Sequence, residues 1–90
     1  MTKQVIKSDG SKEPYDAKKI TGSITRAAQD AKLAPAEINM IVSEISDTVM
    51  QFMESKDEVM SSEIRDLVLM ELDRINPIVS AEWRRFMNSR

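Results

Sequence analysis

Cationic side chains gather near the start of this chain, around a dipeptide that favours a hairpin turn. Lys7, Lys12 and the pair Lys18–Lys19 lie on either side of Asp9-Gly10. The dipeptide favours a tight turn because glycine adopts positive φ angles without steric cost. Asp16 follows as the expected N-cap of a helix. Positive side chains beside a hairpin and a helix start are suited to holding an anion, so this segment predicts an anion site.

The composition limits the chemistry available to such a site. With 90 residues, 41% hydrophobic and 31% charged, the chain has the size and balance of one globular, helix-rich domain, expected over residues 1–90. It has no cysteine, which excludes disulfides and thiolate metal sites within it, and no histidine, the commonest general base and metal ligand. We therefore expect a protein that is not an enzyme.

Charge and hydropathy give further expectations about partners and location. The formal net charge is −2, whereas duplex DNA is usually bound by a basic surface, so we do not expect nucleic acid as a partner. No apolar run reaches the roughly 18 residues of a membrane span, and the polar start is unlike a signal peptide. These features predict a cytoplasmic protein that does not contact membranes.

Apolar periodicity predicts the elements that must position the cations. After the hairpin we expect helices over residues 17–31 and 35–54, a short strand at 58–60, a third helix that follows Ser61 or Ser62 and stops at Asn76-Pro77, and a last helix from 77 onward. Asp16, Ser61 or Ser62, and Asn76 are the expected caps. The order is therefore a hairpin, two helices, a strand and two helices, which is an α+β, mostly α arrangement.

Two residue types carry predictions of their own. Gly22 lies inside the first expected helix, where glycine costs up to about 1 kcal/mol, so we expect close backbone packing there. The chain is also rich in methionine, a residue that fills irregular cores or forms adaptable binding surfaces. Core filling is the favoured role for Met40, Met50, Met53, Met60 and Met70.

The order of elements and several motifs resemble the ATP-cone family, the nucleotide-sensing module of many ribonucleotide reductases and of the bacterial repressor of their genes. The motifs are Val5-x-Lys7-x-Asp9-Gly10 followed by Glu13, then Asp16-x-x-Lys19-Ile20, the run Ser61–Val68, and an aromatic-rich last helix that ends in a basic residue. The resemblance implies a four-helix bundle capped by a small three-stranded sheet. It also implies that ATP or dATP binds between sheet and helices and changes the oligomeric state without being turned over.

The resemblance assigns a set of positions to the nucleotide, namely Val5, Lys7, Ser8, Glu13, Asp16, Lys19, Ile20, Ser61, Arg65 and Arg90. Two lysines, one after the first strand and one in the first helix, would hold phosphates, and two apolar residues would bracket the base. The acidic residues would accept hydrogen bonds from base or ribose, and Ser61, Arg65 and Arg90 would close the far wall. Many members carry arginine where this chain has Ser8, and the missing guanidinium is expected to weaken the hold on phosphates.

Each position also has a purely structural explanation. The lysines could be solvated surface residues, Asp16 and Ser61 could serve only as helix caps, and Val5 and Ile20 could be core residues. Their joint occurrence in the family's order favours a nucleotide site. The chain has no P-loop, because neither of its glycines precedes Lys-Ser or Lys-Thr. Mg²⁺ is expected only as a companion of the nucleotide phosphates, since no carboxylate cage is evident.

The leading interpretation is a non-catalytic regulatory domain whose nucleotide occupancy controls self-association or a partner related to ribonucleotide reductase. An alternative is a helical protein-interaction module that has lost nucleotide binding, with Ser8 as one sign of that loss. A third is a transcriptional regulator like the family's repressors. Those repressors carry a Cys-rich zinc ribbon ahead of the cone, and this sequence contains no cysteine.

Overall fold

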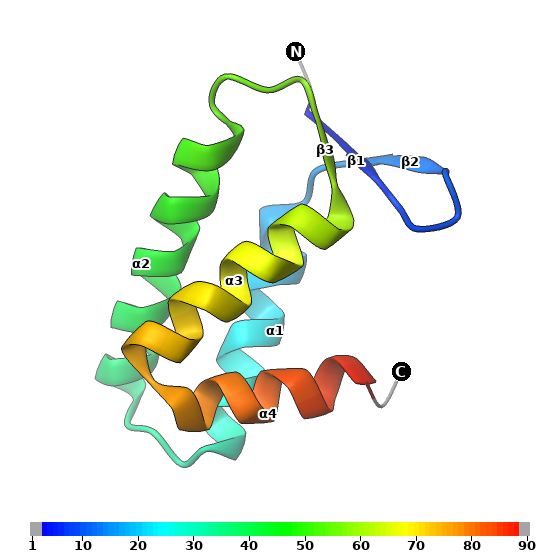
Figure 1. Ribbon diagram of the computed structural model, residues 1–90. Helices are drawn as coiled ribbons and strands as arrows, with labels where there is room; N and C mark the ends of the chain where they lie inside the picture. The colour runs from blue at the N-terminus through cyan, green and yellow to red at the C-terminus, as the bar shows by residue number, and fades with distance from the viewer. Residues whose placement is uncertain (1–2, 89–90) are drawn as a thin grey trace.

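The protein, in a computed structural model that describes residues 3–88, sets a small sheet against one end of a group of helices (Figure 1). The elements within these residues are β1 (Gln4–Ile6), β2 (Lys12–Pro14), α1 (Ala17–Asp30), α2 (Pro35–Met53), β3 (Glu58–Met60), α3 (Ser61–Ile75) and α4 (Pro77–Asn88). In the view of Figure 1, α3 crosses in front of α1, with α2 on the left and α4 below. The predicted fold class and element order are confirmed, and the first two helices each end one residue earlier than expected.

The sheet joins the two halves of the chain. Its strand order is β2-β1-β3, with β1 antiparallel to β2 and parallel to β3. At its centre Val5 pairs with Glu13 on one side and Val59 on the other. The predicted turn is confirmed, because Gly10 has φ of 90° and the N–H of Lys7 donates to the carbonyl of Ser11 at 2.8 Å.

Two of the three expected helix caps are confirmed. The Asp16 carboxylate accepts from the N–H of Lys18 at 2.9 Å, and Asn76 accepts from the N–H of Ile78 at 3.0 Å. The prediction that Ser61 or Ser62 caps the third helix is wrong. Met60 is the N-cap of α3, and Ser61 is already its first helical residue. Strand β3 runs directly into α3. At this N-terminus the side chain of Glu63 accepts a hydrogen bond from the N–H of Met60 at 3.0 Å.

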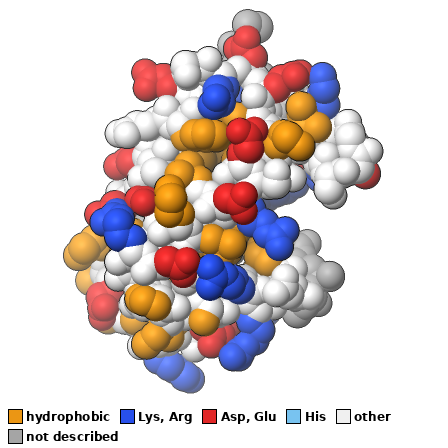
Figure 2. Space-filling view, in the orientation of Figure 1, with side chains coloured by type: hydrophobic (Ala, Val, Ile, Leu, Met, Phe, Trp, Pro, Cys, Tyr) orange, Lys and Arg blue, Asp and Glu red, His pale blue; other side chains and the backbone are white. Residues whose placement is uncertain are grey.

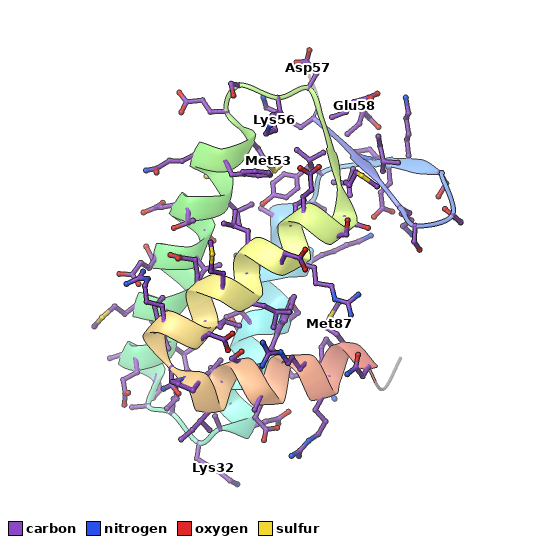
Figure 3. The ribbon with its side chains drawn as sticks, viewed as in Figure 1. Lys32, Met53, Lys56, Asp57, Glu58 and Met87 are labelled. Atoms are coloured by element: carbon purple, nitrogen blue, oxygen red, sulfur yellow. The ribbon has the colours of Figure 1, made fainter. Side chains whose placement is uncertain are left out.

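Helix α1 ends in a Schellman motif, which sets the direction of the connection to α2. Lys32 has φ of 66°, the N–H of Lys32 donates to Gln29, and the N–H of Leu33 donates to Ala28. Lys32 lies at the opposite end of the molecule from the sheet (Figure 3). The motif satisfies the last carbonyl groups of α1 and ends the helix without glycine.

The core is one continuous cluster formed by all four helices and the sheet. Helix α1 packs against α4 and α2, and α3 packs against the same two helices. Ile24, Ile45 and Leu72 are completely buried at these contacts. Trp83 is 3% exposed and its Nε1–H donates to the hydroxyl of Ser23 at 3.0 Å, so its polar group is satisfied. Among the described residues, no helix has the length and apolar character needed to cross a membrane.

The prediction that the methionines fill the core is confirmed only for Met53, which is 3% exposed. Met40 and Met50 are 69% and 62% exposed, and Met60 and Met70 are also exposed. In α2 the core positions are taken by β-branched residues at helical spacing, so Met40 and Met50 project on the opposite side. The exposed methionines are therefore available for contacts with other molecules.

The expectation of close packing at Gly22 is also wrong. A methyl group at this position would meet no atom within 4 Å beyond the adjacent residues and the backbone of its own helix, and the backbone has no positive φ angle that would require glycine. We therefore expect Gly22→Ala to raise the free energy of unfolding by about 0.5–1 kcal/mol, because alanine loses less conformational entropy in a helix. Urea denaturation of both proteins measures the change. A fall in the free energy of unfolding would contradict this expectation and would show that the added methyl group meets other atoms in the folded protein.

Candidate functional site

A cleft of about 700 Å³ opens between the hairpin, the first half of α1, the start of α3 and α4. Figure 2 shows it as the indentation on the right-hand outline, with Lys and Arg side chains near its rim. Most of the positions assigned from the sequence line this cleft: Val5, Lys7, Glu13, Asp16, Lys19, Ile20, Ser61 and Arg65. Ser8 does not line it and is exposed on the hairpin turn, and Arg90 lies outside the described residues. The structure thus brings together residues that are far apart in the chain.

Glu13 forms the electrostatic centre of the cleft. Its Oε2 lies 3.4 Å from the Nζ of Lys7, the residue after β1, and 3.7 Å from the Nζ of Lys19 on α1. The side chain of Lys19 is 68% exposed and that of Lys7 is 50% exposed. Two cations on different elements therefore converge on one oxygen atom, an arrangement that also suits the oxygen of a phosphate.

The cleft is positive within a protein of negative net charge. Its lining includes five cationic side chains, Lys7, Lys18, Lys19, Arg26 and Arg65, and only two acidic ones, Glu13 and Asp16. The whole chain carries a formal charge of −2, so the cations are concentrated here. A concave surface with this charge attracts anions and raises their local concentration.

Apolar side chains form the inner part of the cleft. Val5 is 8% exposed at the centre of the sheet, and Ile20 is half-buried on α1. Ile64 and Val68, both buried, face the cleft from α3. Val5 therefore belongs to the core and to the cleft wall at once, so the structural and functional explanations of this residue are compatible. An apolar floor beneath a ring of cations suits a ligand with a flat base and a charged tail.

Several cleft residues were not identified from the sequence. Arg26 extends the cationic face of α1 and lies 5.3 Å from the ring centroid of Phe86, a cation–π contact between α1 and α4. Trp83 and Met87 line the same end, and Met87 projects from the last turns of α4 (Figure 3). Helical spacing gave one usable signal, because Lys19, Gly22 and Arg26 recur at intervals of three and four residues.

The described part of the chain contains no group of three or more His, Cys, Asp or Glu side chains that could hold a metal ion. The carboxylates of the cleft have other partners. Glu13 forms ion pairs with lysines, and Asp16 caps α1 by accepting from the N–H of Lys18. The donor set therefore fits a phosphate-bearing ligand, to which a cation could be attached through the ligand's own oxygens.

Comparison with known proteins finds a matching family and a group of relatives. A family profile described as the ATP cone domain matches residues 3–82. The transcriptional repressor NrdR of Synechococcus elongatus is 30% identical over 90 residues, which cover 96% of this chain and 52% of the relative. The NrdR proteins of Bordetella avium and Caldicellulosiruptor saccharolyticus are 35% and 34% identical over 74 residues, covering 82% of this chain and 45% and 47% of theirs. The chain thus spans about half the length of the curated relatives it matches.

These relatives correct one expectation from the sequence. Nucleic acid was not expected as a partner because the chain is acidic, but the matched proteins are named as transcriptional repressors, a class that acts on DNA. The charge argument is wrong because net charge describes only the residues counted, and this chain corresponds to about half of each relative. Its negative charge therefore gives no ground for excluding nucleic acid.

Proposed function

The chain belongs to the ATP cone domain family, and we propose that it is a non-catalytic regulatory domain, acting as one unit over residues 1–90, that binds ATP or dATP in the cleft beside the hairpin. The observation that carries this proposal is the convergence of Lys7 and Lys19 on the Glu13 carboxylate. A triphosphate supplies several anionic oxygens in place of that single carboxylate. Arg65 and Arg26 line the same cleft and extend the cationic surface along it.

The same cleft can accommodate the uncharged parts of the nucleotide. Val5 and Ile20 would bracket the adenine ring, with Ile64 behind them. Glu13 and Asp16 would accept hydrogen bonds from base or ribose, and Ser61 would donate from the start of α3. Mg²⁺ would enter with the phosphates. Arg90 remains part of the proposal through the family motif alone, as does the weakening effect of serine at position 8.

Regulation requires the bound nucleotide to favour one conformation or oligomer over another, since equal affinity for all states shifts no equilibrium. The cleft meets a structural condition for this, because its walls come from β1, β2, α1, α3 and α4. A ligand held by all of them would link the hairpin to three of the described helices, α1, α3 and α4. We propose that this linkage changes self-association or the activity of a partner, including one related to ribonucleotide reductase.

Titration calorimetry with ATP, dATP, ADP and AMP, combined with particle mass in the same samples, tests both parts. We expect saturable heat with the triphosphates, weaker binding as phosphates are removed, and a change in mass that follows occupancy. Each lost phosphate removes charge-assisted hydrogen bonds of about 1.5–3 kcal/mol, so AMP should bind at least about tenfold more weakly than ATP.

The absence of heat at millimolar nucleotide would contradict the proposal and favour a helical interaction module that no longer binds nucleotides. If the particle mass stays constant through a saturable titration, the chain binds nucleotide but its self-association does not depend on it.

A second candidate function is control of transcription in the cytoplasm, favoured by the relatives, which are named as transcriptional repressors. In this case the chain would supply the nucleotide-sensing part of a regulator whose DNA-contacting surface requires more than these residues. Electrophoretic mobility of promoter DNA with the chain alone, and with the longest natural version of the protein, distinguishes the two roles.

A further inference from the structure

A second cavity, which shares only Tyr15 with the lining of the nucleotide cleft, lies beside the last turns of α2. It has a volume of about 580 Å³ and is lined by Lys3, Tyr15, Asp47, Met50, Gln51, Met53 and Glu54. Met53 forms its buried floor, and Met50, 62% exposed, forms its outer wall. Figure 3 shows Met53 projecting inward from the end of α2 toward the strands. This cavity is therefore an apolar groove whose wall is a flexible, exposed side chain.

The polar groups around this groove are arranged so that its rim is acidic. Asp47 on α2 and Glu54, the C-cap of this helix, lie on the same side about two turns apart. The one lysine of the lining is outnumbered by the two carboxylates, and its position is fixed, because Lys3 Nζ donates to the carbonyls of Glu54 at 3.1 Å and Lys56 at 2.6 Å. Burial raises the pKa of Tyr15, which keeps its phenol neutral.

The acidic character continues along the whole solvent face of α2. No lysine or arginine occurs between Pro35 and Met53. The face carries Glu37, Met40, Glu44, Asp47, Met50 and Glu54, at intervals of three and four residues. Only the carboxylate of Glu44 is approached by a cation from α3, the guanidinium of Arg74 at 3.7 Å, among the described ion pairs. Methionines and carboxylates thus alternate along an exposed helical stripe.

We propose that this groove and stripe, defined as the α2 face, dock a basic amphipathic helix of a partner protein, with one apolar side chain of the partner inserted between Met50, Met53 and Tyr15. Methionine packs against apolar side chains of many shapes, and such surfaces recur where amphipathic helices are bound. Lysine or arginine residues beside the anchor would lie over Asp47 and Glu54. Carboxylates at the rim disfavour a phosphate-bearing ligand here, in contrast to the nucleotide cleft.

A second copy of the chain is a less suitable occupant. Its basic helices are α1, whose cations Lys18, Lys19 and Arg26 line the nucleotide cleft, and α4. Helix α4 presents an exposed apolar residue, because Ile78 is 65% exposed. There, however, Arg84 pairs with Asp73 at 3.0 Å and Arg85 pairs with Glu82 at 3.6 Å. These contacts reduce the positive charge that α4 could offer to the α2 face, which favours a partner with uncompensated cations.

The seven methionines allow a direct test, because methyl-labelled methionine gives a separate NMR signal for each. The probe is a synthetic helix of roughly 16 residues, about 24 Å long, with leucine on one face and lysine on the other. We expect the methyl signals of Met50 and Met53 to shift on titration with this peptide, while Met87 in the nucleotide cleft stays unchanged. ATP should shift Met87 instead, so failure at one site leaves the other result readable.

Charge-reversal variants locate the peptide. Asp47→Lys and Glu54→Lys should each weaken binding by about tenfold or more. The matched control is Asp66→Lys, an exposed residue of α3 outside the groove. Met50→Ser should weaken binding further at unchanged circular dichroism, since its side chain is exposed.

The proposal would be overturned by any of three results. The first is a Met70 shift as large as that of Met50, and the second is equal weakening by Asp66→Lys, both of which indicate non-specific attraction. The third is self-association of the free chain that Asp47→Lys abolishes, which would make a second copy the occupant.

Discussion

Replacement of both Lys7 and Lys19 by alanine is expected to weaken ATP binding by about a hundredfold. Each ammonium group lies within 4 Å of Glu13 Oε2 and would form a charge-assisted hydrogen bond to phosphate. One such bond contributes about 1.5–3 kcal/mol, which corresponds to a factor of ten or more in affinity. The single variants should each lose about tenfold, and calorimetry at constant ionic strength measures all three, because surface charge effects depend on salt.

Lys12→Ala is the matched control. Lys12 is a hairpin lysine that pairs with Glu58 at 2.7 Å and does not line the cleft. The Lys12→Ala variant removes the same charge from the same region of the protein, so the affinity of this variant for ATP should change by less than about threefold. Equal losses for Lys12→Ala and Lys7→Ala would mean that only the overall field matters. Unchanged affinity in the double variant would reduce the hairpin to a structural cap on the helices.

Truncation of Leu72 in the core should have the largest effect on stability. Its side chain is completely buried on α3, and Leu→Ala changes in such positions typically cost about 2–5 kcal/mol through lost apolar burial and the cavity that remains. A 90-residue domain has a total free energy of unfolding of roughly 5–13 kcal/mol. Leu72→Ala is therefore expected to lower the urea midpoint strongly and to leave part of the population unfolded at elevated temperature.

Met70→Ala, on the same helix, provides the comparison. Met70 is 60% exposed, so its truncation should change the free energy of unfolding by less than about 0.5 kcal/mol. Similar losses for the two variants would mean that Met70 packs against another chain in solution. The pair therefore also reports on whether the exposed methionines are covered.

Local sequence signals were sufficient for much of the fold. Asp9-Gly10 predicted the hairpin turn and Asp16 predicted the start of α1, because both depend on hydrogen bonds between near neighbours in the chain. Ser61 failed as a cap because its role depends on β3, which leads into the helix only after pairing with β1. The prediction that the methionines fill the core was wrong for most of them, because the hydrophobicity of a residue does not show which face of its helix is covered by other elements.

The residues of the candidate site also divide into those that the sequence predicts and those that only tertiary packing brings together. Family motifs identified Lys7, Glu13 and Lys19, and the structure places these three together. Arg26 and Trp83 were missed because their proximity to the cleft results from the packing of α1 against α4. Which of these residues contact a nucleotide remains a prediction that the alanine variants test.

The parallel pairing of β1 with β3 has a consequence for the order in which the molecule assembles and opens. It joins strands separated by about fifty residues, and because closing so long a loop costs chain entropy, we expect this pairing to form after the local contacts of α1 and α2. Each strand has three residues, and Val5 and Lys7 depend on this register. Amide hydrogens of the sheet should therefore exchange with solvent before those of the helices, and bound nucleotide should slow them most. In this view the ligand completes the last-formed unit of the fold, and binding acts as the final folding step of the domain.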